Sequence, residues 1–259
     1  PRMAYQHARI LVTGASGFVG TNLLEAMRAA GYTQVIPLSS RDYNLLEQSE
    51  VRRMLRAQQP DVVIHLAALS AGIKANKERP AEFFYRNLMM TTMVMHESQA
   101  AGVKKFVTCM GGCSYPAQAP SPIKETSMWD GYPQAESAPY STAKKMAIVQ
   151  AEAYRRQYGF NAIVMVPGNL YGPYDNYNLN DSHVIPALIR KVFEAERRGD
   201  KQIVAWGSGA PVRDFIYSRD AARALILALE TYDAPEIINI SSGVQTTIKE
   251  LYALVTELC

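Results

Sequence analysis

The sequence is poor in cysteine, and its positive and negative charges nearly cancel. Three cysteines occur in 259 residues, and their spacing suits neither a disulfide framework nor a zinc site, so we expect no bound metal. The net charge is only +3, and the basic residues are scattered among acidic ones, which argues against a nucleic-acid surface. No apolar run approaches the roughly twenty residues of a membrane span. These absences favour a cytoplasmic protein that binds neither nucleic acid nor membrane.

Short apolar runs alternate with amphipathic stretches over most of the chain. The apolar runs predict buried strands at 9–13, 34–38, 61–68, 104–109 and 161–167. Periodicity near 3.6 residues predicts helices at 21–30, 47–59, 80–101 and 140–158. This alternation predicts an α/β fold, a Rossmann-type doubly wound parallel sheet. Ligands should therefore bind at the carboxyl ends of its strands.

The composition changes after residue 168, where a loop rich in Tyr, Asn, Gly and Pro begins. A helix at 183–198 and a short strand at 202–205 follow, and we interpret them as part of a smaller substrate-binding lobe. Residues 214–231 and 236–240 are expected to return to the sheet. The predicted division is therefore a cofactor-binding domain of 1–168 with 214–240, and a lobe of 169–213 with 241–259.

A glycine-rich turn joins the first predicted strand to the first predicted helix. Gly14 permits a tight turn, Gly17 allows the backbone to approach a pyrophosphate, and Gly20 allows the helix to pack close to the strand. The N-terminus of the helix then offers unpaired N–H groups to the anion. The alternative is a tight strand-to-helix turn without a ligand. Its position between a strand and a helix favours dinucleotide binding.

The second predicted strand ends without the acidic residue that accepts hydrogen bonds from the ribose of NAD. It runs instead into Ser39, Ser40 and Arg41, and a guanidinium there could pair with a 2′-phosphate. This favours NADP over NAD, although Asp42 follows directly. The alternative is that Arg41 is an ordinary surface loop residue.

Tyr140 and Lys144 are four residues apart in a predicted helix and therefore lie on one face. A nearby ammonium group stabilises a phenolate and would bring the phenol pKa down toward a range useful for acid–base catalysis. Two other polar residues receive structural interpretations. We expect His65 to be a packed core histidine, and Asn87 to bond backbone near the active site.

The chain resembles the extended short-chain dehydrogenase/reductases over nearly its whole length. The general motifs are the glycine turn and the Tyr140-Lys144 pair. More specific stretches are Cys113-Ser114-Tyr115-Pro116, 169–176, 182–188 and Trp206-Gly207-Ser208-Gly209 followed by Arg213. Within the family these stretches are most similar to the GDP-L-fucose synthases, which epimerise and reduce a GDP-linked 4-keto-6-deoxy sugar.

The resemblance implies roles for individual residues. Cys113 and His183 would exchange protons at C3 and C5 of the sugar, and Tyr140 would protonate the C4 oxygen while NADPH supplies hydride. The substrate would contact Asn169, Lys191, Trp206 and Arg213. The cofactor would contact Gly14, Ser16, Gly17, Phe18, Val19, Gly20, Arg41, Asp42, Leu66, Ala67, Ala68, Met110, Gly111, Lys144, Pro167, Gly168, Asn169, Leu170 and His183. Because related enzymes commonly form dimers, the resemblance also implies that this protein is a homodimer.

The sequence departs from the family in two places. Family members carry Ser or Thr two residues before the cysteine, where its hydroxyl bonds the C4 oxygen, but this chain has Gly111. Water or a neighbouring group could substitute, the substrate could differ, or reduction could be secondary to epimerisation. Two alternatives to a reductase follow, an epimerase or dehydratase without net reduction and a weakened dinucleotide-binding regulator. Family members also continue beyond this chain's last residue, which implies an incomplete lobe.

Overall fold

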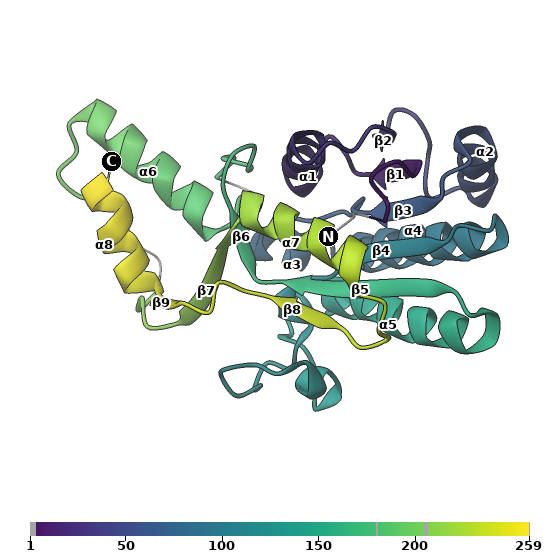
Figure 1. The fold of residues 1–259 in the computed structure, drawn as a ribbon. Coiled ribbons are helices and arrows are strands. Elements are labelled where there is room, and N and C mark those ends of the chain that lie inside the picture. The colour runs from purple at the N-terminus through teal and green to yellow at the C-terminus, as the bar shows by residue number, and fades with distance from the viewer. Residues whose placement is uncertain (1–3, 180, 205–206, 259) are drawn as a thin grey trace.

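The computed structural model describes residues 4–179, 181–204 and 207–258. Its centre is a sheet of six parallel strands in the order β2-β1-β3-β4-β5-β8 (Figure 1). The strands are β1 Ile10–Thr13, β2 Val35–Leu38, β3 Val62–His65, β4 Lys105–Cys109, β5 Asn161–Pro167 and β8 Ile238–Ile240. The parallel, doubly wound α/β prediction is therefore confirmed.

The register of the sheet aligns the ends of its central strands. Leu38, Thr13, His65, Thr108 and Val164 form one row of paired residues across five strands. Strands β2, β1 and β3 end at this row, while β4 runs one residue and β5 three residues beyond it, so the loops that follow the five strands leave the sheet along the same edge. This is the edge at which open parallel sheets bind ligands.

Helices cover both faces of the sheet, because alternate residues of each buried strand point to opposite sides. The helices of the large part are α1 Phe18–Ala29, α2 Gln48–Gln58, α4 Pro80–Ala100, α5 Ala138–Tyr158 and α7 Ser218–Thr231. One core joins Ile10 and Val12 to α1 and α7. The other core joins Leu11 and Val63 to α2, α4 and α5. Among the described residues, no helix combines the length and apolar character that crossing a bilayer requires.

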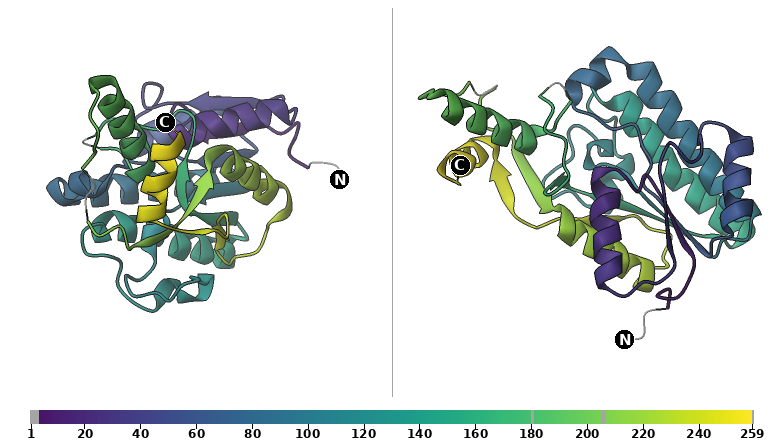
Figure 2. Two further views of the ribbon diagram at one scale, coloured as in Figure 1. Left: turned by 90° about the vertical axis from the view of Figure 1, so that its left-hand side faces the viewer. Right: turned by 90° about the horizontal axis from the view of Figure 1, so that it is seen from above.

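A smaller group of elements lies at one end of the molecule (Figures 1 and 2). It contains the short sheet β6-β7-β9 and two helices, with bounds β6 Asn169–Tyr171, β7 Val212–Tyr217, β9 Gln245–Thr247, α6 Val184–Arg198 and α8 Ile248–Leu258. Leu188 and Val192 of α6 pack against Leu251 and Val255 of α8 in a separate core. The connections also contain the short helices α3 Ile73–Glu78, η1 Gly112–Ser114 and η2 Glu125–Trp129.

The structure corrects several local predictions. Residues 202–204 form no strand, and Ala205 lies outside the described residues. The segment 214–231 first forms β7, which pairs with β6 and β9, and then returns the chain to the main sheet as predicted, as helix α7 packed against it. Strand β6 and helix α3 were not predicted, since both are too short to show a period. Helix α1 begins at Phe18, earlier than expected, because Gly17 already serves as its N-cap.

Lys105 is fully buried at the start of β4, and its ammonium group caps the C-terminal end of α7. Nζ donates to the carbonyls of Leu229 and Tyr232 at 2.7 and 2.8 Å and to Asp233 Oδ1 at 2.8 Å. We expect Lys105→Met to lower the free energy of unfolding by about 3 kcal/mol, since these acceptors lose a charged donor. Urea denaturation would measure this loss.

Lys104 provides the matched control for that substitution. Its side chain is 71% exposed and pairs with Asp61 at 2.8 Å. Lys104→Met should cost less than about 1 kcal/mol, because exposed ion pairs contribute little. Equal losses in the two variants would contradict the capping role of Lys105.

Candidate active site

The glycine turn between β1 and α1 is shaped by close approaches of the backbone. Gly14 has φ of +69°, and a Cβ there would lie 2.6 Å from the backbone nitrogen of Ala67. A Cβ on Gly20 would collide with the carbonyl of Gly14. Gly17 is different, since its added Cβ would meet only the Gly14 carbonyl at 3.3 Å. The space above Gly17 is therefore open to a ligand, while Gly14 and Gly20 are needed for packing.

The N-terminus of α1 suits an anion. Among the described residues, no side chain caps it and no acidic residue occupies its first turn. The N–H groups of Phe18 and Val19 lie in this first turn, and Ser16 precedes the cap. Unpaired N–H groups and the helix dipole together favour a phosphate. The residues present therefore fit the pyrophosphate of a dinucleotide.

The loop after β2 separates the roles of Arg41 and Asp42. Oδ2 of Asp42 accepts hydrogen bonds from Ser39 N at 2.7 Å and from Ser39 Oγ at 2.9 Å. These bonds hold the pKa of Asp42 below its usual value and occupy the carboxylate locally. Arg41 is exposed, and its guanidinium has no hydrogen bond or ion pair with any described residue. This arrangement leaves the cation, and not the acid, available to a ligand.

The segment 66–72 follows β3 and connects three parts of the site. Its first residues meet the glycine turn, where Ala67 N donates to Thr13 Oγ1 at 3.3 Å. Its middle is fixed by Asn87, which accepts from Leu69 N at 3.0 Å and donates to Leu69 O at 2.9 Å. Its end meets the lobe, where Gly72 N donates to Asp181 O at 3.0 Å. The prediction for Asn87 is thereby confirmed.

His65 at the end of β3 is a core residue, as predicted. It is fully buried and its ring nitrogens bond to Thr13 Oγ1 at 2.8 Å and Thr91 Oγ1 at 3.3 Å. Burial lowers the pKa of His65 to about 3, and the charge of Lys144 adds to this effect. The imidazole is therefore neutral and holds the strand end in place.

Gly111, Cys113, Tyr140 and Lys144 form what we call the Tyr140 cluster. A Cβ on Gly111 would lie 3.1 Å from Cys113 Sγ and 3.9 Å from Tyr140 Cε1, so the three residues adjoin one another. Cys113 lies on η1 and Tyr140 on the first turn of α5. Lys144 follows one turn later, is 4% exposed, and lies close enough to influence both Cys109 and Cys113.

The electrostatics of the cluster contradict the expected effect of Lys144 on Tyr140. Burial raises the pKa of Tyr140, with smaller contributions from Cys113 and Cys109, and a hydrogen bond to Ser70 opposes the rise. Burial likewise lowers the pKa of Lys144. Cys113 is exposed as a residue, yet the crowding around its thiol raises the pKa. At neutral pH both Tyr140 and Cys113 therefore carry their protons.

The residues predicted at the ends of β4 and β5 meet at the same edge. Met110 N donates to Met165 O at 2.9 Å, while the Met110 side chain is buried in the core, so only its backbone can face a ligand. Gly168 N donates to Ile240 O at 2.8 Å. Asn169 Nδ2 donates to Asp214 O at 3.0 Å, which fixes that side chain. Pro167 ends β5, and Leu170 packs against the core.

The remaining predicted residues belong to the lobe. His183 is exposed at the N-cap of α6 and lies near the half-buried Asp175, whose pKa is raised by burial. Lys191 lies on α6 and Arg213 on β7, where Arg213 Nη1 donates to Val212 O at 2.8 Å. No hydrogen bond or ion pair among the described residues joins Arg213 to the Tyr140 cluster. Trp206 lies outside the described residues.

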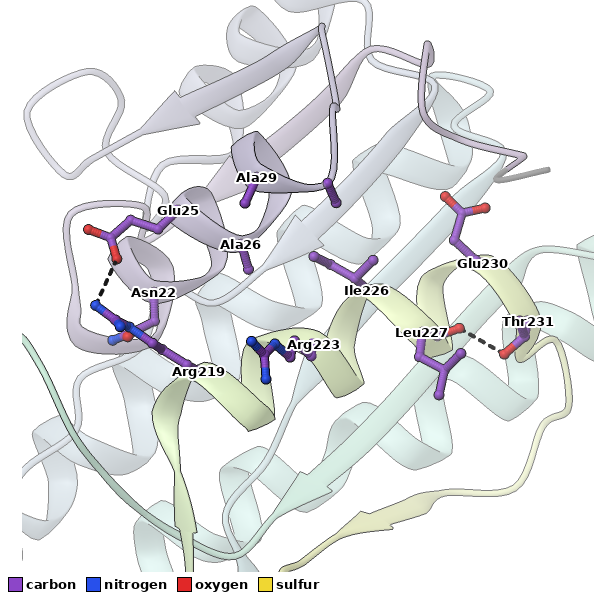
Figure 3. Close-up of a pocket in the computed structure, with 11 residues that line it drawn as sticks. Asn22, Glu25, Ala26, Ala29, Arg219, Arg223, Ile226, Leu227, Glu230 and Thr231 are labelled. Carbon is purple, nitrogen blue, oxygen red and sulfur yellow. Dashed lines mark hydrogen bonds and ion pairs between the residues drawn. The ribbon is translucent and has the colours of Figure 1, made fainter. Parts of the chain in front are cut away.

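A separate hollow of about 770 Å³ lies between α1 and α7, outside the edge that carries these residues. Figure 3 shows Ala26 of α1 facing Ile226 of α7 across it, with Glu25 and Arg219 paired at one end. Its lining combines five aliphatic residues with Asn, Glu, Arg and Thr side chains, and it contains no Cys, His or Tyr. The chemistry-bearing residues are thus found at the strand ends.

One positioning residue was missed by sequence reasoning. Asn22 on α1 donates to Pro173 O at 2.9 Å and accepts from Ser218 Oγ at 3.0 Å. It thereby ties the loop 169–176 to the glycine-turn helix. A buried asparagine within an amphipathic helix is the signal that could have revealed it.

The sequence comparisons agree with this geometry. The model of the NAD dependent epimerase/dehydratase family matches residues 10–241. The chain belongs to this family. It is 41% identical over 247 residues to a GDP-L-fucose synthase of Sinorhizobium fredii, and the match covers 95% of this chain and 78% of that protein. It is 37% identical over 256 residues to GDP-L-fucose synthase 1 of Arabidopsis thaliana, covering 99% and 79%.

Solved structures of this family share the fold. A GDP-L-fucose synthetase from Naegleria fowleri, bound to NADP, matches with a TM-score of 0.90 at 29% identity. The match covers 99% of this chain and 84% of that one. The resemblance to the extended short-chain dehydrogenase/reductases is therefore confirmed, and with it the Rossmann-type sheet.

Proposed function

We propose that this family member is an NADP-dependent epimerase/reductase of a GDP-linked 4-keto-6-deoxy-hexose. The observation that carries the proposal is the Tyr140 cluster, because Cys113 and Tyr140 adjoin one glycine at the edge where the dinucleotide cradle opens. The relatives named GDP-L-fucose synthase and the NADP-bound Naegleria structure support both substrate class and cofactor.

The cofactor would be held by the residues whose geometry fits it. The glycine turn and the first turn of α1 take the pyrophosphate, and Arg41 takes the 2′-phosphate. Bound NADPH supplies the hydride that reduces C4. Tyr140 keeps its proton in the resting site and gives it to the C4 oxygen. Lys144, one turn away, orients the ribose and offsets the negative charge left on the phenol.

Epimerisation would use the two proton-carrying groups on opposite sides of the sugar. Cys113 is protonated at neutral pH because burial raises its pKa, so it suits the donor role. His183 is exposed at the N-cap of α6 and suits the acceptor role. Asn169, Lys191 and Arg213 would contact the nucleotide sugar, as would Trp206. A free Cys113 thiol also fits a reducing compartment, and we propose the cytoplasm.

The experiment that tests the function combines two readouts. The protein is mixed with NADPH and GDP-4-keto-6-deoxy-mannose in deuterated water. We expect stoichiometric loss of NADPH absorbance together with deuterium at C3 and C5 of the product. Deuterium uptake at constant absorbance would support an epimerase without net reduction, the second candidate, which Gly111 motivates. If neither signal appears and no nucleotide sugar changes the melting temperature, the result would support a dinucleotide-binding regulator.

Arg41 allows the choice of cofactor to be tested separately. Arg41→Ala should weaken NADPH binding about 10- to 100-fold, because a charge-assisted bidentate contact is lost, and should leave NADH binding nearly unchanged. Fluorescence titration of both nucleotides measures this difference. Arg53→Ala is the control, since Arg53 pairs with Glu50 on α2 at 2.6 Å. Equal weakening of NADPH and NADH would refute the 2′-phosphate role.

We further propose that the protein forms a homodimer through α4 and α5. Tyr85 on α4 is 55% exposed and Val149 on α5 is 48% exposed, and burial of such apolar side chains favours association. Analogy with related enzymes supplies the rest of this proposal. Val149→Glu should shift the sedimentation coefficient from that of a dimer to that of a monomer. A wild-type protein that sediments as a monomer would end the proposal.

A further inference from the structure

The chain before α6 leads into His183 through a turn that we call the His183 turn, made by Asn178, Asp181 and Ser182. The backbone N–H groups of Asp181 and Ser182 both donate to Asn178 O, at 3.0 and 2.8 Å, so the turn is closed on itself. The Ser182 hydroxyl is buried and has no hydrogen-bond partner among the described residues. The position of His183 therefore depends on what the backbone of this turn contacts.

Gly72 contacts the His183 turn from the segment that follows β3. Its N–H donates to Asp181 O at 3.0 Å. A Cβ on Gly72 would lie 3.1 Å from Ser182 O and 3.5 Å from Asp181 O, so the two backbones lie directly against each other. Gly72 has φ of −64°, a value that any residue adopts. Glycine at this position therefore serves the close approach and not the conformation of the chain.

The segment 66–76, which we call the strap, begins in the core of the large part of the molecule. Ala67 N donates to Thr13 Oγ1 at 3.3 Å. The side chain of Asn87, a residue only 1% exposed, binds both the N–H and the carbonyl of Leu69 at 3.0 and 2.9 Å. The start of the strap is therefore fixed to the central sheet and to α4.

Asn76 on α3 fixes the other end of the strap. It is 5% exposed, and its Nδ2 donates to Ala71 O at 3.0 Å and to Gly72 O at 3.1 Å. Its backbone N–H donates to the same Gly72 carbonyl at 3.3 Å. Gly72 is thus held through its carbonyl while its N–H binds Asp181. The strap therefore connects the central sheet to the turn before His183.

We propose that Gly72 and Asn76 position His183 for proton transfer during epimerisation. The inference rests on the proposed function. In that reaction His183 removes a proton from a carbon beside the keto group, the electron pair passes to the C4 oxygen as an enolate, and Cys113 returns a proton to the carbon. A misplacement of about 1 Å between reacting groups can cost 10²-fold in rate. Gly72 and Asn76 are positioning residues, because they act through His183.

The kinetic test uses Gly72→Ala, which keeps the N–H but brings a methyl group to 3.1 Å from the Ser182 carbonyl. The His183 turn must then move by a few tenths of an ångström. We expect deuterium exchange at C3 and C5 to fall about tenfold, while hydride transfer to an already epimerised keto sugar stays within about twofold of the wild-type rate. Asn76→Ala should give the same pattern, because it releases the end of the strap.

Gly131→Ala is the matched control. Gly131 lies in the connection between η2 and α5, and its added Cβ would meet only Pro116, at 3.3 Å, which is a similarly tight contact. It should change neither exchange nor hydride transfer. Urea denaturation compares the stability of the variants. If Gly72→Ala does not fold, Asn76→Ala decides the question by the same criteria.

A second test does not depend on turnover. The sequence contains four histidines, so labelling the histidine rings with carbon-13 gives four signals, and that of His183 is identified by its loss in His183→Asn. This signal should move in Gly72→Ala and in Asn76→Ala but not in Gly131→Ala. The signals of His7 and His96 should stay unchanged in all three variants.

The two tests separate the inference from the function on which it rests. If the wild type exchanges deuterium into no nucleotide sugar but the His183 signal moves in the strap variants, the proposed function fails and the positioning of His183 stands. If the wild type exchanges and both strap variants leave exchange unchanged, the inference is overturned. An equal loss of exchange and hydride transfer also overturns it, because the whole site would then be disturbed. A His183 signal that stays in place in both strap variants overturns it as well.

Discussion

Replacing Tyr140 by Phe is expected to lower kcat for reduction by about 10²- to 10⁴-fold, the range found when a general acid is lost. The ring of Phe keeps the edge contact with Phe83, so the cluster should retain its shape. Burial raises the pKa of Tyr140, and the wild-type rate should therefore fall only at alkaline pH, as the phenol loses the proton that it donates. NADPH consumption in a stopped-flow spectrometer measures the effect.

The matching control is Tyr154→Phe on the same helix. The Tyr154 hydroxyl pairs with His96 Nδ1 at 2.7 Å, away from the Tyr140 cluster, and its loss should leave kcat within about twofold of the wild-type value. NADPH affinity should be similar in both variants, because neither hydroxyl is proposed to bind the cofactor tightly. Normal turnover by Tyr140→Phe would disprove its role as the acid.

Cys113→Ser should abolish most deuterium exchange at C3 and C5, by about 10²-fold or more, while leaving hydride transfer to an already epimerised keto sugar. The reason is chemical, since the Cys113 thiol holds a proton that it can give up, and the serine hydroxyl is a much weaker acid. Mass spectrometry of the recovered sugar measures exchange, and NADPH absorbance measures hydride transfer in the same sample.

Cys109→Ser serves as the control for this second substitution. Burial raises the pKa of Cys109 to about 12, and it ends β4 before the site begins, so its replacement should not reduce exchange. Tyr140→Phe should show the reverse pattern, with exchange retained and hydride transfer lost. If Cys113→Ser and Tyr140→Phe each lost both activities, the assignment of exchange to the thiol and of reduction to the phenol would be wrong.

Much of the fold could be predicted because each element carries its own signal. Runs such as 62–64 and 162–166 are apolar throughout, which is typical of a strand buried on both faces. Gly14 and Gly17 lie between β1 and α1, and Gly20 lies in the first turn of α1, so the spacing of the three glycines predicted the turn correctly. Short elements carry no such signal, so β6 and α3 were missed, and the strand expected from residue 202 is absent over the described residues 202–204. The domain division at 168, 213 and 240 stays a prediction.

The site itself depended on proximity, which a linear pattern does not contain. The sequence alone predicted the parallel sheet, the glycine turn and the placement of Tyr140 and Lys144 on one helix face, because these features follow from short-range periodicity. Only the folded chain placed the ring of Phe83 against that of Tyr140, engaged Asp42 with Ser39, and raised the pKa of Tyr140 where a decrease was expected. Desolvation and hydrogen bonding between distant segments are set by packing, and packing is decided in three dimensions.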